Sequence, residues 1–258
     1  MKATHTRSVN PNSIRMHSEQ SDFYGYRTPY IAQLFEAVCH ELDITKQSTV
    51  LDMGCGRGEV AGFLAGHAGQ VHAIDGSPEM IALASQKSNI AYQVVDLNTT
   101  SPSIEAAADH MFFGRSIHWF PGATLRRLST DLLPAGGRVV VCSTQWTPVG
   151  EWGQKYLEIK NRFAPRAAGL NLDFSGQSNL GDAGFVPVKR WEAQATMQAT
   201  ARFMVGHTYS TTYGSRLEAL LKNAADFEAQ VQQALMHYEA QQQLTWKINS
   251  WALAYART

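Results

Sequence analysis

A glycine-rich string in the first third of the chain, Val50 to Val60 (VLDMGCGRGEV), carries the residues best suited to holding a nucleotide. Apolar residues lead into Asp52, and Gly54, Gly56 and Gly58 then alternate with other residues before a stretch typical of a helix. Glycines permit a tight turn and a close approach of the backbone to a ligand, and the first turn of a helix presents free N–H groups. This order of strand, turn and helix predicts a nucleotide-binding turn.

A second acidic residue supports this interpretation. The apolar run Val71 to Ile74 ends in Asp75, and a carboxylate at the end of the second strand suits the two hydroxyls of a ribose. The third glycine comes one residue too early for the GxGxxG pattern of dinucleotide enzymes, whose sixth position is Glu59 here. Its negative charge opposes a pyrophosphate but not a ligand with a sulfonium and an ammonium. These two departures from the dinucleotide pattern make an NAD-dependent oxidoreductase a less favoured interpretation of the turn.

Strands and helices alternate around these residues. We expect strands at 50–53, 71–74, 91–95, 111–113 and 139–142, and helices at 30–42, 59–66, 78–86 and 123–133. Farther along, the pattern predicts a helix at 152–163, a loop at 165–184, a strand at 185–191, helices within 201–243 and a final strand at 244–255. Apolar strands separated by helices indicate βαβ units and a parallel sheet that is covered on both faces.

The composition limits the kinds of partner. The 258 residues include 22 Lys+Arg and 22 Asp+Glu, so no net charge attracts a nucleic acid or an anionic membrane, and we expect neither partner. No apolar run approaches the roughly 18 residues that cross a bilayer, and the polar N-terminus lacks the core of a signal peptide, which predicts a cytoplasmic protein. The three cysteines and nine histidines show no metal-ligand spacing, so we expect reduced thiols and no metal.

The chain is expected to consist of an arm and a single domain. Residues 1–21 are polar and without sustained periodicity, which predicts a flexible arm. Residues 22–258 are expected to form one domain, with a helical cap contributed by 22–30 and about 145–243.

Taken in series, these features resemble the class I S-adenosylmethionine-dependent methyltransferases from about Leu51 to Thr144. The resemblance implies an α/β fold: a Rossmann-like, seven-stranded, mostly parallel sheet with helices on both faces and a helical cap. It also implies S-adenosyl-L-methionine as cofactor. The residues that match its binding positions are Asp52, Gly54, Cys55 and Gly56 under the methionine part, Asp75 at the ribose, and Gly76, Ser77, Met80, Asp96 and Leu97 around the adenine.

Two arginines complete the expected cofactor set. The segment Phe23 to Tyr30 (FYGYRTPY) resembles the YxxxRPxYP segment of a small-molecule branch of the family, in which Arg27 could pair with the cofactor carboxylate. Arg115, after the fourth expected strand, is also assigned to the cofactor. For Asp96 the alternative role is a solvated strand end or a helix cap.

The string Met111 to Pro121 (MFFGRSIHWFP) separates classes of methyl acceptor. It lacks the (N/D)PP(Y/F) tetrad of relatives that methylate exocyclic amino groups of bases or glutamine amides. Its HW pair is similar to that of the trans-aconitate and ubiquinone-type methyltransferases, which implies that His118 lies near the transferable methyl as a general base. The alternative is a structural imidazole. The expected acceptor-binding residues are Tyr24, Trp119, Trp146, Trp152, Tyr156, His207 and Ser210. For the three tryptophans and Tyr156 the alternative is core packing, and His207 and Ser210 are named because HTYS resembles a serine-rich segment over the acceptor site of the same branch.

The function expected from this resemblance is transfer of a methyl group to an O, N or C nucleophile of a small-molecule metabolite. Intact glycines and Asp75 speak for binding rather than for turnover. A protein of this fold that binds S-adenosylmethionine or a nucleoside without methyl transfer is therefore the main alternative.

Overall fold

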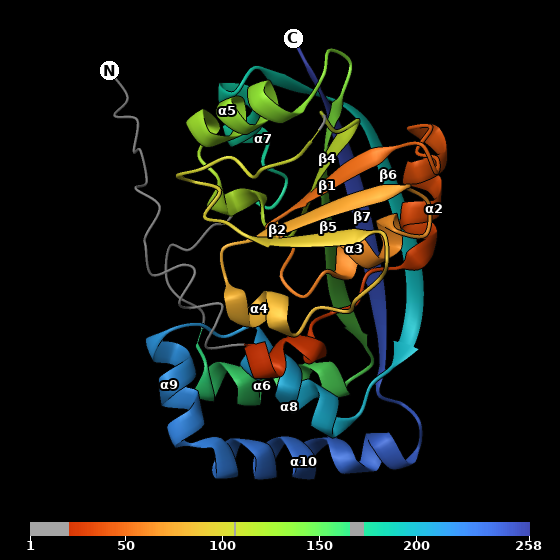
Figure 1. Cartoon of the computed structure of the whole chain (residues 1–258). Coiled ribbons are helices and arrows are strands. Elements are labelled where there is room, and N and C mark those ends of the chain that lie inside the picture. Colours follow the sequence, from red (N-terminus) through yellow and green to blue (C-terminus); the bar gives the residue numbers. More distant parts are fainter. Residues whose placement is uncertain (1–20, 106, 166–172) are drawn as a thin grey trace, which may run out of the picture.

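The computed structural model describes residues 21–105, 107–165 and 173–258 (Figure 1). The flexible arm predicted for 1–21 lies outside the described residues except for Ser21, which begins a short 3-10 helix, η1 (Ser21–Tyr26). No helix within the described ranges is long and apolar enough to cross a membrane.

Seven strands of the described chain form one sheet. In spatial order they are β3 (Ile90–Val94), β2 (Gln70–Asp75), β1 (Thr49–Met53), β4 (His110–Gly114), β5 (Arg138–Val149), β7 (Thr245–Arg257) and β6 (Phe185–Gln198). The five strands β3, β2, β1, β4 and β5 each run parallel to their neighbours, whereas β7 is antiparallel to both β5 and β6. The predicted seven-stranded, mostly parallel sheet is therefore confirmed.

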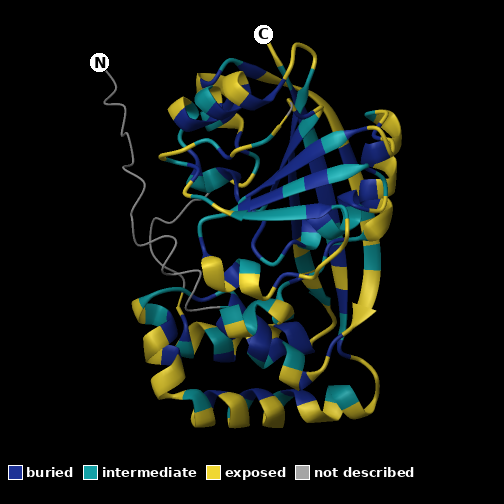
Figure 2. Cartoon of the chain, viewed as in Figure 1, coloured by how far each residue is buried: buried dark blue, intermediate teal, exposed yellow. Residues whose placement is uncertain are grey.

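Helices cover both faces of this sheet (Figure 1). On one face pack α2 (Ala32–Glu41) and α3 (Glu59–Leu64), and on the other pack α5 (Gly122–Leu132) and α7 (Gln177–Asp182). The short helix α4 (Pro78–Ala82) follows β2. Because both faces are covered, the central strands are buried almost throughout, as the dark blue ribbons of Figure 2 show. Their nearly continuous apolar sequences follow from this double burial.

The remaining helices form a layer at one end of the sheet (Figure 1). Their apolar side chains gather in a third cluster with residues of β5 and β7, and the helices are α6 (Trp152–Phe163), α8 (Ala201–Ser210), α9 (Ser215–Lys222) and α10 (Ala224–Ala240). The helix η1 packs against α8, where a Cβ on Gly206 would lie 2.3 Å from the ring of Tyr26. This layer lies where the cap was predicted, except that residues 145–149 and 185–198 belong to strands of the sheet.

Three further boundaries differ from the predictions. The helix expected at 78–86 ends at Ala82 as α4. The strand β5 continues to Val149 because β7 pairs with it along its whole outer part, as far as Val149 opposite Thr245. The segment predicted as a loop at 165–184 contains α7 in its described part. That helix is only six residues long, and it is held by burial of Leu180 against α5 rather than by a periodic sequence.

Candidate cofactor and acceptor site

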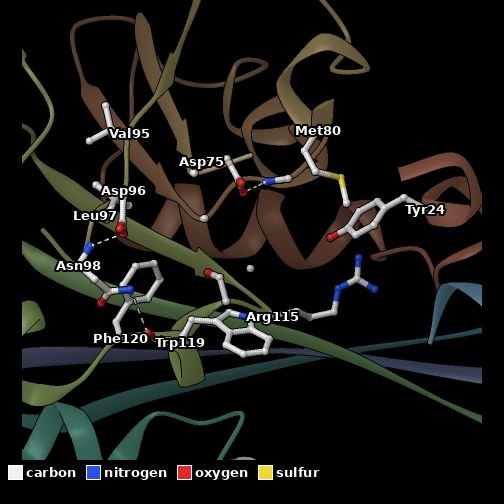
Figure 3. A pocket seen from close by; sticks show the side chains of 15 residues that line it. Tyr24, Asp75, Met80, Val95, Asp96, Leu97, Asn98, Arg115, Trp119 and Phe120 are labelled. Atoms are coloured by element: carbon white, nitrogen blue, oxygen red, sulfur yellow. Dashed lines mark hydrogen bonds between the residues drawn. The ribbon is translucent and has the colours of Figure 1, made fainter. Parts of the chain in front are cut away.

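A cleft opens at the carboxyl ends of the parallel strands (Figure 3). It lies where β1 and β4 are neighbours and the chain leaves them in opposite directions, which is where ligands bind in open α/β sheets. About 670 Å³ of empty space is present, part of it open to solvent, which suits a small-molecule site. The lining residues are Tyr24, Gly54, Gly56, Asp75, Gly76, Met80, Val95, Asp96, Leu97, Asn98, Gly114, Arg115, Ser116, Trp119 and Phe120.

The glycine turn between β1 and α3 forms the floor of the cleft. Gly54 and Gly56 adopt φ angles of 68° and 55°, in the left-handed region that favours glycine. A Cβ on Gly54 would lie 2.7 Å from Ser116 Cβ, and one on Gly56 would lie 3.1 Å from Tyr24 Oη. The amides of Gly54 and Cys55 both donate to the carbonyl of Ile74, which ties the turn to β2. Side chains at these two positions would therefore fill the space that a ligand needs.

Asp75 stands at the end of β2, with one carboxylate oxygen on the glycine turn and the other on the loop that leads into α4. Its Oδ2 accepts from Gly56 N and its Oδ1 from Ser77 N, each at 2.8 Å. The backbone N–H of Gly76 also acts on this carboxylate, so at least one of its roughly four acceptor positions remains for a ligand. Burial raises the pKa of Asp75 above its usual range, while the backbone donors oppose that shift. The carboxylate is thus held in place by the loops and still able to accept a hydrogen bond from a ribose hydroxyl.

Four residues assigned to the cofactor do not belong to the described lining of the cleft, and three of them support the loops that form it. Asp52 is fully buried, and its Oδ2 accepts from Ala61 N at 2.8 Å, which fixes α3 behind the turn. Burial raises the pKa of Asp52 to about 7. Cys55 is buried, and Ser77 Oγ caps α4 by accepting from Met80 N. The fourth, Arg27, donates through Nη2 to Tyr213 Oη at the edge of the cap.

The loop after β3 forms the opposite wall. Leu97 is buried, whereas Asp96 is exposed and accepts from Asn98 N through Oδ1 at 3.0 Å, as in a turn that caps itself. Arg127 of α5 donates to the carbonyl of Leu97 at 2.6 Å. With Met80 across the cleft, this wall offers an apolar slot whose rim carries a carboxylate (Figure 3).

The sequence analysis missed five lining residues. They are Val95, Asn98, Gly114, Ser116 and Phe120. All of them lie at or just beyond the ends of β3 and β4. Since strand ends of a parallel sheet meet at one edge, that position alone was a signal that could have identified them.

Arg115 lines the cleft, but its guanidinium is held by protein groups. Its Nη2 lies 2.8 Å from Glu59 Oε2, and its Nη1 donates to the carbonyl of Thr28 at 2.8 Å. The sequence argument treated Glu59 as a negative charge at the glycine turn. The ion pair with Arg115 neutralises that charge, so this part of the argument against a pyrophosphate is wrong. The early third glycine is unaffected by this correction.

On the acceptor side, the structure places Tyr24 and Trp119 in the lining of the cleft. His118 is next to Trp119 and packs between the rings of Trp119 and Phe174, with centroid distances of 4.7 and 4.9 Å. Burial, followed by the positive charge of Arg27, lowers the pKa of His118 to about 4, and Asp173 only partly opposes this. The imidazole is therefore neutral at pH 7 and weakly basic.

The other five expected acceptor residues lie outside the described lining of the cleft, Trp146 on β5 and the rest in the cap. Trp152, Tyr156 and Ser210 are fully buried, and Trp146 packs its ring against Trp152, Tyr156 and His207. His207 Nε2 lies 3.2 Å from Thr28 Oγ1, below the segment that carries Tyr24. This aromatic group forms the core between α6, α8 and the sheet, so core packing accounts for its composition.

The residues of the cleft fit S-adenosylmethionine. The bare glycine turn leaves room for the methionine part, the spare acceptor capacity of Asp75 suits a ribose hydroxyl, and the slot between Met80 and Leu97 suits a purine ring. No group of three or more His, Cys, Asp or Glu in the described ranges could hold a metal ion.

Comparison with known proteins agrees with this geometry. Residues 50–136, from β1 to the loop before β5, match the family of methyltransferase domains. The fold resembles that of a provisionally assigned type II methyltransferase of Anaeromyxobacter dehalogenans, with a TM-score of 0.65 and 16% identity. The similarity covers 90% of this chain and 97% of that protein. YjhP from E. coli is similar over 94% of this chain and 99% of its own, with a TM-score of 0.52 and 15% identity. No curated protein matches the chain significantly.

Proposed function

We propose that the chain is a class I S-adenosylmethionine-dependent methyltransferase that methylates an O, N or C nucleophile of a small molecule, and the match of residues 50–136 to the family of methyltransferase domains supports this proposal. The observation that carries this proposal is the position of Tyr24. Its phenol belongs to η1, which packs against the cap, yet it lines the cleft directly above the glycine turn. An acceptor must approach the methyl group beside a covering element, which favours a small molecule over a polymer.

The charges around the cleft support a small, uncharged or anionic acceptor. Glu59 is neutralised by Arg115, while Arg27 lies close enough to His118 to lower its pKa. The chain as a whole has a formal net charge of zero, so nothing attracts a nucleic acid over a large surface. We infer that recognition is local and made by the residues between η1 and the end of β4.

The protein's own part in the reaction is mainly to bind and orient. When bound, S-adenosylmethionine supplies a methyl group on a positively charged sulfur, so that a neutral thioether leaves. Asp75 and the glycine turn hold the cofactor in one position, and Tyr24 with Trp119 excludes water and orients the acceptor beside it. Such positioning is a major source of rate in a reaction of two bound molecules.

An acceptor that must lose a proton needs a group to take it. His118 is neutral at pH 7, but with a pKa of about 4 it is a weak base. A carboxylate, which is already the nucleophilic anion at pH 7, therefore fits the site better than an alcohol does. In that case His118, which is not part of the described lining of the cleft, packs against Trp119 and moves no proton.

Two measurements test the proposed function. Calorimetry with S-adenosylmethionine and with NAD separates a methyl donor site from a dinucleotide site. Incubation with S-adenosylmethionine and pooled metabolites, followed by mass spectrometry for a gain of one methyl group, then separates transfer from binding alone. Tight binding of S-adenosylmethionine with no methylated product from any small-molecule pool would favour the protein that binds without turnover.

A further inference from the structure

Glu59 and Arg115 form a partly buried ion pair beneath residues 23–30, which we term the N-terminal segment. The side chains of Arg115 and Glu59 are 12% and 32% exposed, and the two charged groups approach to 2.8 Å. Glu59 Oε1 accepts from Tyr30 N at 3.0 Å, and Arg115 Nη1 donates to the carbonyl of Thr28 at 2.8 Å. The pair thus fastens the N-terminal segment to α3 and to the turn after β4.

The backbone of Arg115 indicates that these contacts hold the residue in place. Its φ of 57° lies in the left-handed region, which disfavours residues that carry a side chain. Its amide donates to the carbonyl of Cys142 at 2.9 Å, and its guanidinium carbon lies 4.8 Å from the centre of the Tyr30 ring. A conformation of this kind persists where the surrounding contacts determine it, and such positions are common beside ligands.

The ion pair is also next to the ligand cleft. Arg115 lines the cleft, and so does Tyr24, the residue of the N-terminal segment that stands over Gly56 (Figure 3). The other side of the segment is held independently by the cap, where the rings of Phe23 and Tyr209 lie 4.9 Å apart. Loosening the ion pair would therefore free Thr28 O and Tyr30 N and leave the attachment to α8. The hydrogen bonds of Pro29 O with Thr144 Oγ1 and of Tyr30 Oη with Cys142 O would also remain.

We propose that Glu59 and Arg115 are positioning residues that fasten the N-terminal segment over the bound cofactor and thereby slow its release. This inference rests on the proposed function, because it requires that the cleft binds S-adenosylmethionine. The two side chains act as one unit: the carboxylate holds Tyr30 N, the guanidinium holds Thr28 O, and each keeps the other in position.

The test is the rate at which S-adenosylhomocysteine leaves, measured by stopped-flow through tryptophan fluorescence. Glu59→Gln and Arg115→Gln should each release it about tenfold faster, because losing one partner of this partly buried pair loosens the segment beside the cleft; tenfold corresponds to about 1.4 kcal/mol. The double variant should release it no faster than the single variants, since the pair works as a unit. Glu192→Gln is the matched control, because it breaks an exposed ion pair with Arg190 on β6.

Hydrogen exchange of the free protein gives a readout that does not need the cofactor. The amide of Tyr30 and its neighbours in the N-terminal segment should exchange faster in both variants, with exchange in α8 unchanged. Unchanged release and unchanged exchange in folded variants would overturn the proposal, as would additive effects in the double variant. A parent protein that binds no S-adenosylhomocysteine would overturn the proposed function, whereas faster exchange would still show the fastening of the segment.

Arg115→Lys covers the case in which Arg115→Gln does not fold. Lysine keeps the positive charge but lacks the planar fork that reaches Thr28 O and Glu59 together. Its release rate should lie between those of the parent and Glu59→Gln. A rate equal to that of the parent would show that charge alone is sufficient and would overturn the role assigned to the fork.

Discussion

Asp75→Asn tests the ribose assignment with almost no change of shape. In the parent, one carboxylate oxygen accepts from Gly56 N and the other from Ser77 N, each at 2.8 Å. The asparagine side chain has a single oxygen and a donor NH₂ group, so one of these two loop amides must lose its acceptor. The positions that would accept the ribose hydroxyls lose their negative charge at the same time.

The expected loss follows from these contacts. A hydrogen bond to a charged group is worth about 1.5–3 kcal/mol. Replacing Asp75 by a neutral residue should therefore weaken S-adenosylmethionine binding by that amount, which is roughly 10- to 150-fold in Kd. The variant should also lose much of its preference for the cofactor over a 2′-deoxyadenosyl analogue, because the second hydroxyl no longer meets a carboxylate.

Isothermal titration calorimetry with both ligands measures these two effects. Asp226→Asn, the same chemical change on an exposed face of α10, is the control and should leave both affinities unchanged. If folded Asp75→Asn binds the cofactor as tightly as the parent, or discriminates against the deoxy analogue equally well, Asp75 is not the ribose ligand.

The pH dependence of binding provides an independent check on Asp75. Burial raises the pKa of this carboxyl in the free protein, so it takes up a proton at a higher pH than an ordinary aspartate does. The affinity for S-adenosylmethionine should reach its full value above this raised pKa, where the carboxylate is ionised, and should fall as the pH drops through it. Asp75→Asn should not show this part of the pH dependence, and an identical acid-side profile in the variant would contradict the reasoning.

Three further outcomes are expected. Gly56→Val places a branched side chain at a φ of 55° in the floor of the cleft, so calorimetry should show S-adenosylmethionine binding weakened about 100-fold, or by about 2.7 kcal/mol. The control is Gly62→Ala, where a Cβ meets nothing within 4 Å and binding should not change. Equal effects of the two substitutions would refute the assignment of the glycine turn. His118 should titrate at about 4 by NMR, and its removal should alter KM for the acceptor more than kcat; a titration near 6.5 would show that burial does not control this imidazole. The pKa of Asp52 is about 7 in the folded protein, against an ordinary value of 3.8, so the free energy of unfolding of the parent should fall as the pH rises from 4 to 7. Urea unfolding of Asp52→Asn should not show this fall. The same dependence of unfolding free energy on pH in both proteins would contradict the prediction.

Local sequence was sufficient to predict the nucleotide-binding half of the fold. The strands β1 to β4 are short, apolar and bounded by turn residues, and each lies where the pattern predicts it. Gly54 and Gly56 could be interpreted from sequence because a left-handed backbone and a close approach require glycine whatever surrounds them. The order of strands then brings Asp75 to the same edge as the glycine turn, since the carboxyl ends of parallel strands meet there.

The tertiary structure decided which of the expected residues reach the cleft. Tyr24 lines it, whereas Trp152 and Tyr156 are buried in the cap, although all three are aromatic residues on helices. Their sequence periodicity reports only that one face of a helix is buried, and it does not say whether the neighbour is a ligand or another helix. The strands β1 to β4 could be predicted, in contrast, because a short apolar run between turn residues indicates a buried strand whatever packs against it.

The pairing of Glu59 with Arg115 likewise depends on long-range contacts. The two residues are far apart in the sequence, and they meet because α3 and the turn after β4 lie side by side at the edge of the sheet. From sequence, Glu59 was a charge facing a ligand and Arg115 was a cofactor ligand. Only the packing of the N-terminal segment on both residues shows that each charge is held by the other, because a side chain's electrostatic environment is set by neighbours that the chain brings in from a distance.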